Sequence, residues 1–191
     1  MKAGVRTFPR GIDSSPRRAL PSVAINWKED VRRWHPNQAW IWQAGGLGVF
    51  DPGINALSIL TRILPRSVFV TSADLAFPAN RDAPIAASLA LSDARGLKIA
   101  AEFDFRQTGP QNWDIEIETD GGPVSFSHGG RKLRVGDQQH VDAAKAEYPA
   151  LYRRFRELAA SGECDVDLAP LQLVADAFLL GRRRTVESFE D

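Results

Sequence analysis

Alternating apolar and polar residues occupy much of the chain and predict β-strands. The first run begins at Val23 and continues through Ile25 and Trp27, which share one face. Runs with the same period of two follow at positions 67–77, 84–92, 96–106, 112–119, 124–126 and 133–135. Short segments rich in glycine, proline or aspartate separate them. Consecutive alternating strands with short turns predict an antiparallel meander with one covered face.

Between positions 51 and 65 a helical spacing replaces the alternation. Ile54, Leu57 and Leu60 recur on one face, and Leu64 continues it. Asp51 is expected to cap the amino-terminal end, because an aspartate side chain accepts hydrogen bonds from the free amides of the first turn. This segment therefore predicts an amphipathic helix that packs on the sheet.

Two further helices are predicted near the carboxyl terminus. The apolar stripe of the first is Leu151, Tyr152, Phe155 and Leu158, and that of the second is Leu171, Val174, Ala175 and Phe178. Pro149 is expected to open the first helix, Asp167 to cap the second, and Arg182–Arg184 to suit the negative end of its dipole. The element order predicts an α+β fold, with an open, mainly antiparallel sheet and helices packed on one face.

The chain divides into a short tail and one domain. Positions 1–21 show neither period, and their arginines, prolines and serines predict a flexible basic tail. Positions 22–191 are expected to form a single domain, because 191 residues lie within the usual size of one. Within that domain, positions 31–50 predict a loop rich in aromatic residues and glycine.

Composition excludes several classes of protein. The 24 basic and 24 acidic side chains cancel, so nothing points to nucleic acid or to an anionic membrane surface. The single cysteine, Cys164, excludes an internal disulfide and a zinc site made of several cysteines. No apolar run is long enough to span a bilayer, and no signal-peptide pattern opens the chain. We expect a cytoplasmic protein.

The glycines of 45–48 do not form a nucleotide-binding loop. A dinucleotide fingerprint needs G-x-G-x-x-G between a strand and a helix of a βαβ unit. The run GGLGVFD lacks that spacing, and no second parallel strand follows the predicted helix. We expect a flexible loop here, and no cofactor site made by this chain's own motifs.

Asp51 and Asn55 lie four residues apart and share a face if the helix begins at Asp51. Capping by Asp51, with Asn55 in solvent, is the simpler interpretation of the spacing. The pair also suits a polyhydroxylated ligand, because a carboxylate accepts hydrogen bonds from hydroxyls while an amide both donates and accepts.

An acidic residue and two tryptophans are further candidates. Glu29 ends the first strand, where an exposed strand end is the commonest outcome. Trp34, in the aromatic loop, fits the core and a platform for a sugar ring equally well. Trp113 lies on the apolar side of its strand, which favours the core.

The histidines and the cysteine give no catalytic pattern. His35, His128 and His140 are widely separated and lack metal-ligand spacing, so we interpret them as surface polar residues and predict no metal site. Cys164 stands between two acidic residues, which disfavour a thiolate.

The long block WKEDVRRWHPNQAWIWQAGGLGVFDPGINALSILTRILP carries a family resemblance. With AEFDFR, QNWDIEI, EYPALYRRF and DVDLAPLQLVADAFLLGRRR, it resembles the C-terminal substrate domain of the Gfo/Idh/MocA oxidoreductases. Within that family the chain looks most like the bacterial aldose 1-dehydrogenases that act on D-galactose and L-arabinose. The likeness spans positions 23–189.

The resemblance implies roles for five residues. Glu29 would contact the sugar, Trp34 and Trp113 would line the pocket, and Asp51 and Asn55 would lie at the reacting carbon. The resemblance therefore favours a catalytic role for the last pair over capping, and the pocket over the core for Trp113. It also implies an N-terminal Rossmann domain that binds NAD or NADP, and a sheet that pairs with a second copy as a homo-oligomer.

The family's G-x-G-x-x-G and Glu-Lys-Pro motifs have no counterpart in this sequence. One hypothesis is that the chain is the substrate-binding half of an NAD(P)-dependent aldose 1-dehydrogenase, which oxidises D-galactose or L-arabinose at C1 to the lactone. Alone it would be inactive, because it brings no hydride acceptor. The alternative is a non-enzymatic module that binds a sugar or a partner chain, or the remnant of a truncated gene.

Overall fold

The computed structural model describes residues 22–142 and 147–190, so the predicted basic tail lies outside the described residues. Along the chain the elements are β1 (Ser22–Lys28), α1 (Val31–Trp34), η1 (Ala39–Trp42), α2 (Phe50–Ile63), β2 (Val68–Pro78), β3 (Ala86–Asp93), β4 (Lys98–Asp104), β5 (Asn112–Glu118), β6 (Val124–Ser127), β7 (Lys132–Val135), β8 (Gln138–Asp142), α3 (Glu147–Ser161), α4 (Ala169–Leu180) and β9 (Arg182–Val186). The predicted α+β class is confirmed. Among the described helices, none is long and apolar enough to cross a membrane.

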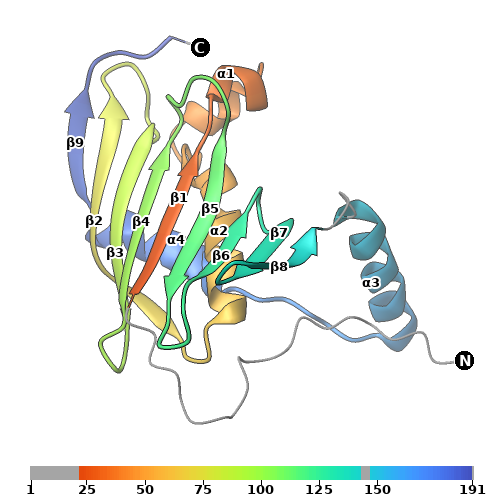
Figure 1. Ribbon diagram of the computed structural model, residues 1–191. Helices are drawn as coiled ribbons and strands as arrows, with labels where there is room; N and C mark the ends of the chain where they lie inside the picture. The colour runs from red at the N-terminus through yellow and green to blue at the C-terminus, as the bar shows by residue number, and fades with distance from the viewer. Residues whose placement is uncertain (1–21, 143–146, 191) are drawn as a thin grey trace, which may run out of the picture.

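The strands form one open sheet in the order β8-β7-β6-β5-β1-β4-β3-β2-β9 (Figure 1). The prediction of an uninterrupted meander is wrong at one place, because β1 lies between β4 and β5 and runs parallel to β4. The register sets Ile25 beside Ala101 on one side and Ile115 on the other. The buried face of β1 thus continues those of both neighbours, which favours the insertion.

The arginines that follow α4 form a strand, β9. Arg182–Val186 pairs with β2 in parallel at the edge of the sheet. Asp74 accepts hydrogen bonds from Arg182 at 2.6 Å and from Arg184 at 3.2 Å. The arginines thus follow the end of α4, as expected, but the strand that they form was not predicted, and their ion pairs with Asp74 join it to β2.

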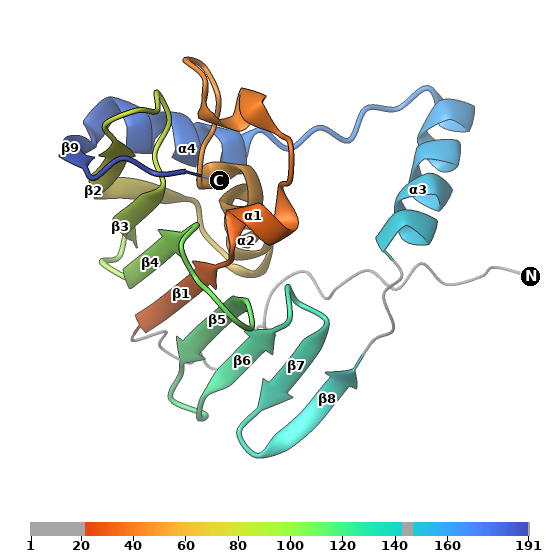
Figure 2. The same ribbon diagram turned by 90° about the horizontal axis from the view of Figure 1, so that it is seen from above.

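Helices α2 and α4 pack on one face of the sheet and against each other (Figures 1 and 2). Phe50 of α2, which is fully buried, lies 5.6 Å from Phe103 of β4 and 5.4 Å from Phe178 of α4, measured between ring centroids. Gly53 lets α2 approach the sheet closely, since a Cβ there would come within 2.9 Å of the Phe103 ring. The close packing fixes the first turn of α2, where Asp51 lies.

Helix α3 stands apart from the sheet in both views (Figures 1 and 2). Leu151, Tyr152 and Phe155 of its predicted apolar stripe are exposed. The expected packing of this helix on the sheet is therefore not observed. The stripe predicted for α4 is also rotated: Leu171 is exposed, while the fully packed face includes Leu173 instead.

The segment between β1 and α2 is more ordered than the predicted loop. It contains the helical turns α1 and η1. Gly48 is buried, and its amide donates to the Ile41 carbonyl at 3.0 Å. The interpretation of 45–48 as a flexible loop is therefore wrong at Gly48, which packs against the backbone of Pro84.

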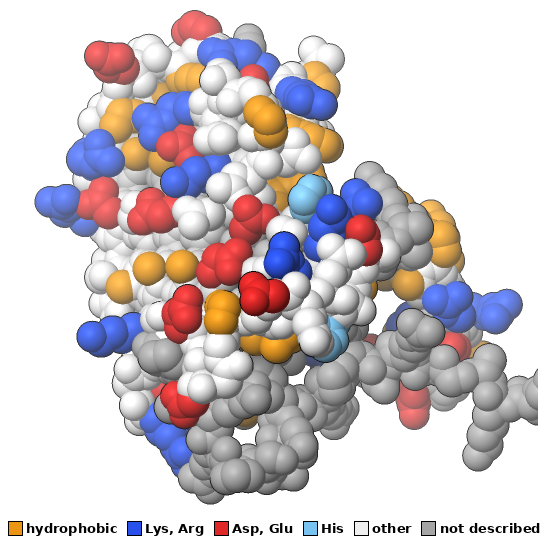
Figure 3. Space-filling model, viewed as in Figure 1, with side chains coloured by type: hydrophobic (Ala, Val, Ile, Leu, Met, Phe, Trp, Pro, Cys, Tyr) orange, Lys and Arg blue, Asp and Glu red, His pale blue; other side chains and the backbone are white. Residues whose placement is uncertain are grey.

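The opposite face of the sheet is open and carries acidic side chains over its middle strands (Figure 3). Glu102 projects there from β4, and Asp114, Glu116 and Glu118 project from β5. Burial raises the pKa of Glu116, and the charges of Asp114 and Glu118 raise it further. The three carboxylates of β5 therefore repel one another on this face.

Candidate functional site

The end of β1 and the short helix α1 place several side chains over the start of α2. The Glu29 amide donates to the Asp104 carbonyl at 2.9 Å, and the Val31 amide to that of Phe105 at 3.1 Å, so the backbone stays attached to β4 beyond the strand end. Asp30 then caps α1 by accepting from the Arg32 amide at 3.1 Å. This turn directs the chain back over the buried face of the sheet.

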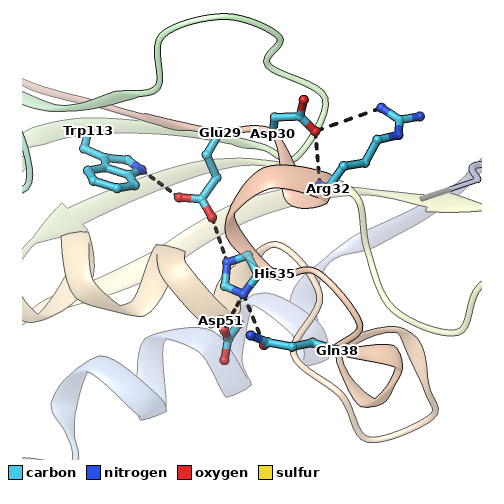
Figure 4. A network of polar contacts seen from close by, with 7 residues as sticks. All are labelled: Glu29, Asp30, Arg32, His35, Gln38, Asp51 and Trp113. Atoms are coloured by element: carbon cyan, nitrogen blue, oxygen red, sulfur yellow. Dashed lines mark hydrogen bonds and ion pairs between the residues drawn. The ribbon is translucent and has the colours of Figure 1, made fainter.

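The Glu29 carboxylate lies at the centre of a polar network (Figure 4). Its side chain is 2 % exposed, so the interpretation as an exposed strand end is wrong. One oxygen accepts from the indole N–H of Trp113 at 2.7 Å, and the other lies 2.7 Å from Nε2 of His35. Both oxygens are engaged, which satisfies the hydrogen-bonding needs of a buried carboxylate.

His35 is part of the site, and its interpretation as a surface residue is wrong. Its side chain is 13 % exposed, and its Nδ1 lies 3.2 Å from Oε1 of Gln38 and 3.6 Å from Oδ2 of Asp51. Burial lowers the pKa of His35, but the hydrogen bonds to Glu29 and Gln38 and the negative charges of Glu29 and Asp51 outweigh it, so that the net shift is upward. The imidazolium form is thereby favoured between two carboxylates. The isolated His-Pro pair in the sequence gave no spacing signal for this role.

Asp51 lies in the first turn of α2 and is not its cap. The N-cap is Val49, because the Phe50 amide already donates to the Leu47 carbonyl and the Asp51 amide to that of Gly48. The Asp51 side chain is 27 % exposed. Burial raises its pKa, His35 opposes this shift, and Glu29 adds to it. Asp51 is thus the carboxylate of the network that solvent, or a ligand, can reach.

Two of the tryptophans form an aromatic wall beside the carboxylates. The ring centroids of Trp34 and Trp113 lie 4.8 Å apart with the planes tilted by 59°, and both residues are half-buried. Trp27, which is 5 % exposed, stacks on Trp113 at 6.1 Å and belongs to the core. Asn55 follows Asp51 by one turn of α2 and is exposed, without a hydrogen bond to the network among the described residues.

The structure thus brings four of the five candidate residues together: His35 lies between Glu29 and Asp51, Glu29 holds Trp113, and Trp34 packs on Trp113. The fifth, Asn55, lies on the next turn of α2. The arrangement offers a half-exposed carboxylate, an exposed amide and two indole rings on one side of the molecule. Such a surface can hold a polyhydroxylated ligand, since hydroxyls donate to the carboxylate and apolar ring faces pack on the indoles. In the described part of the chain no three His, Cys, Asp or Glu side chains gather as a metal site.

The raised pKa of His35 predicts how the stability of the fold depends on pH. Because its pKa is above the ordinary 6.5 in the folded state, the contribution of the imidazolium is fully present below pH 6.5 and is lost as the pH rises through the folded-state pKa. We expect the wild-type free energy of unfolding to fall over that range, relative to the His35→Gln variant. Urea unfolding at pH values on both sides of 6.5 gives the free energy of unfolding of each protein. If this free energy depends on pH in the same way for wild type and His35→Gln, the prediction is contradicted.

Comparison with known proteins shows what the chain is similar to. The chain is 51 % identical, over 174 residues, to a galactose 1-dehydrogenase of Pseudomonas fluorescens, a match that covers 91 % of this chain and 57 % of that protein. No family model matches the chain. The resemblance to the C-terminal substrate domain of the Gfo/Idh/MocA oxidoreductases is confirmed.

Solved structures agree with this assignment. The crystal structure of D-galactose-1-dehydrogenase from Rhizobium etli superimposes with a TM-score of 0.81 at 59 % identity, covering 91 % of this chain and 55 % of that protein. The 3-ketoreductase KijD10 from Actinomadura kijaniata, solved with NADP, shares the fold at a TM-score of 0.70 and 16 % identity, with 87 % of this chain and 54 % of that one covered. The chain therefore spans just over half the length of these relatives.

Proposed function

We propose that this chain is the substrate-binding half of an NAD(P)-dependent aldose 1-dehydrogenase, acting on D-galactose or L-arabinose at C1. One observation carries the proposal: the buried Glu29 holds the indole of Trp113 and the imidazole of His35 next to Asp51. Buried titratable groups with shifted pKa values gather at functional sites more often than elsewhere. The identity to galactose 1-dehydrogenases supports the same assignment.

In the proposed reaction the bond between C1 and its hydrogen breaks and the anomeric hydroxyl loses its proton, so that C1 becomes the carbonyl of the lactone. Asp51 would accept or orient that proton, and a pKa raised toward the working pH suits such an exchange. Asn55 would bind a neighbouring hydroxyl, and the rings of Trp34 and Trp113 would line the pocket.

Glu29 would act on the sugar through its neighbours in the conformation described. Both of its oxygens are engaged, so its influence passes through the orientation of His35 and Trp113. Direct contact between Glu29 and the sugar stays a prediction, since it requires one of these bonds to open.

NAD or NADP would supply the hydride acceptor of the whole enzyme. The glycines of 45–48 do not fit such a cofactor. The amides of Gly46 and Gly48 donate to the carbonyls of Gln43 and Ile41, and are not free to bind phosphate. We therefore assign no cofactor contact to this segment, and expect the isolated chain to be inactive as a dehydrogenase.

Titration of the purified chain with D-galactose tests the proposal by calorimetry or by chemical shifts of the Trp34 and Trp113 indoles. We expect Asp51→Asn to weaken binding by about tenfold or more, because a hydrogen bond to a charged acceptor contributes about 1.5–3 kcal/mol. The fold should not lose stability, since the raised pKa of Asp51 means that its ionised form is disfavoured in the folded state. Asp82→Asn is a matched control on an exposed acid, and equal affinities for both variants would refute the role of Asp51.

A non-enzymatic binding module is the second candidate, and the open face of the sheet favours it. Ala24, Ala100 and Ala90 lie side by side on three neighbouring strands and are exposed, so a second copy can approach closely there. Glu102 and Glu116 flank this flat region and oppose the approach while they are ionised. Sedimentation of the chain decides whether it forms the proposed homo-oligomer. The cytoplasmic location stays a prediction.

A further inference from the structure

The residues after β9 cross from the edge of the sheet to α1 and η1 (Figures 1 and 2). We call the residues 187–190 the C-terminal strap. The strap starts from a strand that pairs with β2, and it ends against the segment that carries Trp34 and His35. It thus brings together Arg32 and Glu190, which are 158 positions apart in the sequence.

One anchor of the strap is the loop after β2. The Asn80 side chain donates to the Phe189 carbonyl at 3.1 Å and to a Glu190 side-chain oxygen at 2.9 Å, and it accepts from the Phe189 amide at 2.9 Å. Arg81 adds a hydrogen bond from its Nε to the same carbonyl at 3.3 Å. Asn80 therefore satisfies both backbone groups of Phe189 and fixes where its ring points.

The other anchor is the pair of helical turns next to the site. Arg32 of α1 donates to the Glu190 carbonyl at 2.7 Å, and its guanidinium carbon lies 4.5 Å from the centre of the Phe189 ring. The same ring lies 5.8 Å from Trp42 of η1, between centroids. Phe189 thus contacts both turns and holds them together.

A continuous series of ring contacts leads from the strap to the site. Trp42, which is 3 % exposed, lies 5.6 Å from the fully buried Phe105, and Phe105 lies 5.5 Å from His35. Helix α1 has only four residues, and an isolated turn of that length is unstable in water. Tertiary contacts must therefore keep it in place.

We infer that the C-terminal strap positions the α1–η1 segment, with Phe189 as the positioning residue that keeps Trp34 and His35 in the site. Phe189 does not touch the proposed substrate region and acts through Arg32 and Trp42. Its effect on sugar affinity rests on the proposed function, whereas its effect on His35 does not.

The test compares Phe189→Ala with Ser188→Ala, an exposed neighbour, and with Ile117→Val, which loosens the core far from the strap. In Phe189→Ala we expect amide exchange at Trp34 and His35 to accelerate about tenfold, because their hydrogen bonds to Asp30 and Val31 open more often. The pKa of the His35 ring, followed by NMR, should move toward 6.5 as its contacts with Glu29, Gln38 and Asp51 loosen. Phe189→Tyr should restore both values.

The controls separate positioning from loss of stability. Ile117→Val should lower the thermal midpoint of unfolding without changing the pKa or the amide exchange of His35. If Phe189→Ala does not fold, Asn80→Ala replaces it in the test, and we expect the same changes in exchange and in the His35 pKa. The inference is overturned if the strap variants leave the His35 pKa and the amide exchange at Trp34 and His35 unchanged. It is also overturned if Ile117→Val changes both quantities as much as the strap variants do. If wild type does not bind D-galactose, the proposed function fails, and the NMR readout still decides the role of the strap.

Discussion

Glu29→Ala is expected to lower the free energy of unfolding by about 3 kcal/mol and to abolish measurable sugar binding. The substitution leaves the indole N–H of Trp113 and a nitrogen of His35 without their acceptor, and unpaired buried groups cost about 1–3 kcal/mol each. It also removes buried volume next to the aromatic wall. Urea unfolding followed by tryptophan fluorescence measures the first effect, and calorimetric titration with D-galactose the second.

Glu29→Gln separates the charge of this side chain from its size. The amide oxygen can still accept from Trp113, so we expect a loss of only about 1 kcal/mol in stability. The pKa of His35 should nevertheless fall, because the neighbouring negative charge and a charged acceptor are both removed. Glu163→Ala, at an exposed position, is the control for a general effect of acid removal. If Glu29→Ala unfolds at the same urea concentration as Glu163→Ala, the network does not stabilise the fold.

Gly48→Ala is expected to lower the free energy of unfolding by about 3 kcal/mol or more. A Cβ at this position would overlap the Pro84 carbonyl oxygen and come within 2.8 Å of the Pro84 nitrogen and Cδ. The Val49 amide donates to the same carbonyl at 2.8 Å, so moving the segment at Gly48 away from Pro84 also breaks this hydrogen bond. Left-handed backbone conformation adds about 1–2 kcal/mol for a residue with a side chain, and overpacking adds about 1–3 kcal/mol.

Gly45→Ala is the matched control for this prediction. Gly45 also has a positive φ, of 86°, but a Cβ there would meet no atom within 4 Å. We expect a loss of about 1 kcal/mol, from backbone strain alone. Equal losses for the two variants in urea unfolding would show that the contact with Pro84 does not matter, and that the start of α2 is as loosely packed as a surface loop.

The strands β1 to β7 were predictable because each one carries its own alternation of apolar and polar residues, whereas β8 and β9 were not among the predicted runs. The alternation from Val23 to Trp27 is enough to predict a strand with one buried face, and all three apolar residues of that run are buried in the structure. The neighbours of β1 were not predictable in the same way. Pairing of β1 with β4 joins segments about 75 residues apart, and no local pattern specifies which of several similar apolar strands will be chosen.

The candidate site shows the same division. The spacing of Asp51 and Asn55 left capping and a ligand site open, and only the resemblance of motifs favoured a site that includes them. The resemblance also added Glu29, Trp34 and Trp113 to that site. His35 was missed, since a lone histidine has no periodicity and its role depends on a carboxylate on each side. The cap assigned to Asp51 was wrong because the turn over 47–50 had already begun the helix, and that turn depends on Gly48 packing against a distant proline.

The sequence by itself determined the class of fold, most strand and helix positions, and the relationship to sugar dehydrogenases, because hydrophobic periodicity and motif content are local properties. Only the tertiary structure decided that β1 enters the sheet between β4 and β5, that Arg182–Val186 forms an edge strand, and that His35 joins Glu29 to Asp51. The two strand placements depend on contacts between segments far apart in the sequence, and the position of His35 depends on how the chain folds back over α2. Whether such a contact lowers the free energy depends on how deeply its groups are buried in the folded chain. The local sequence pattern does not specify that burial.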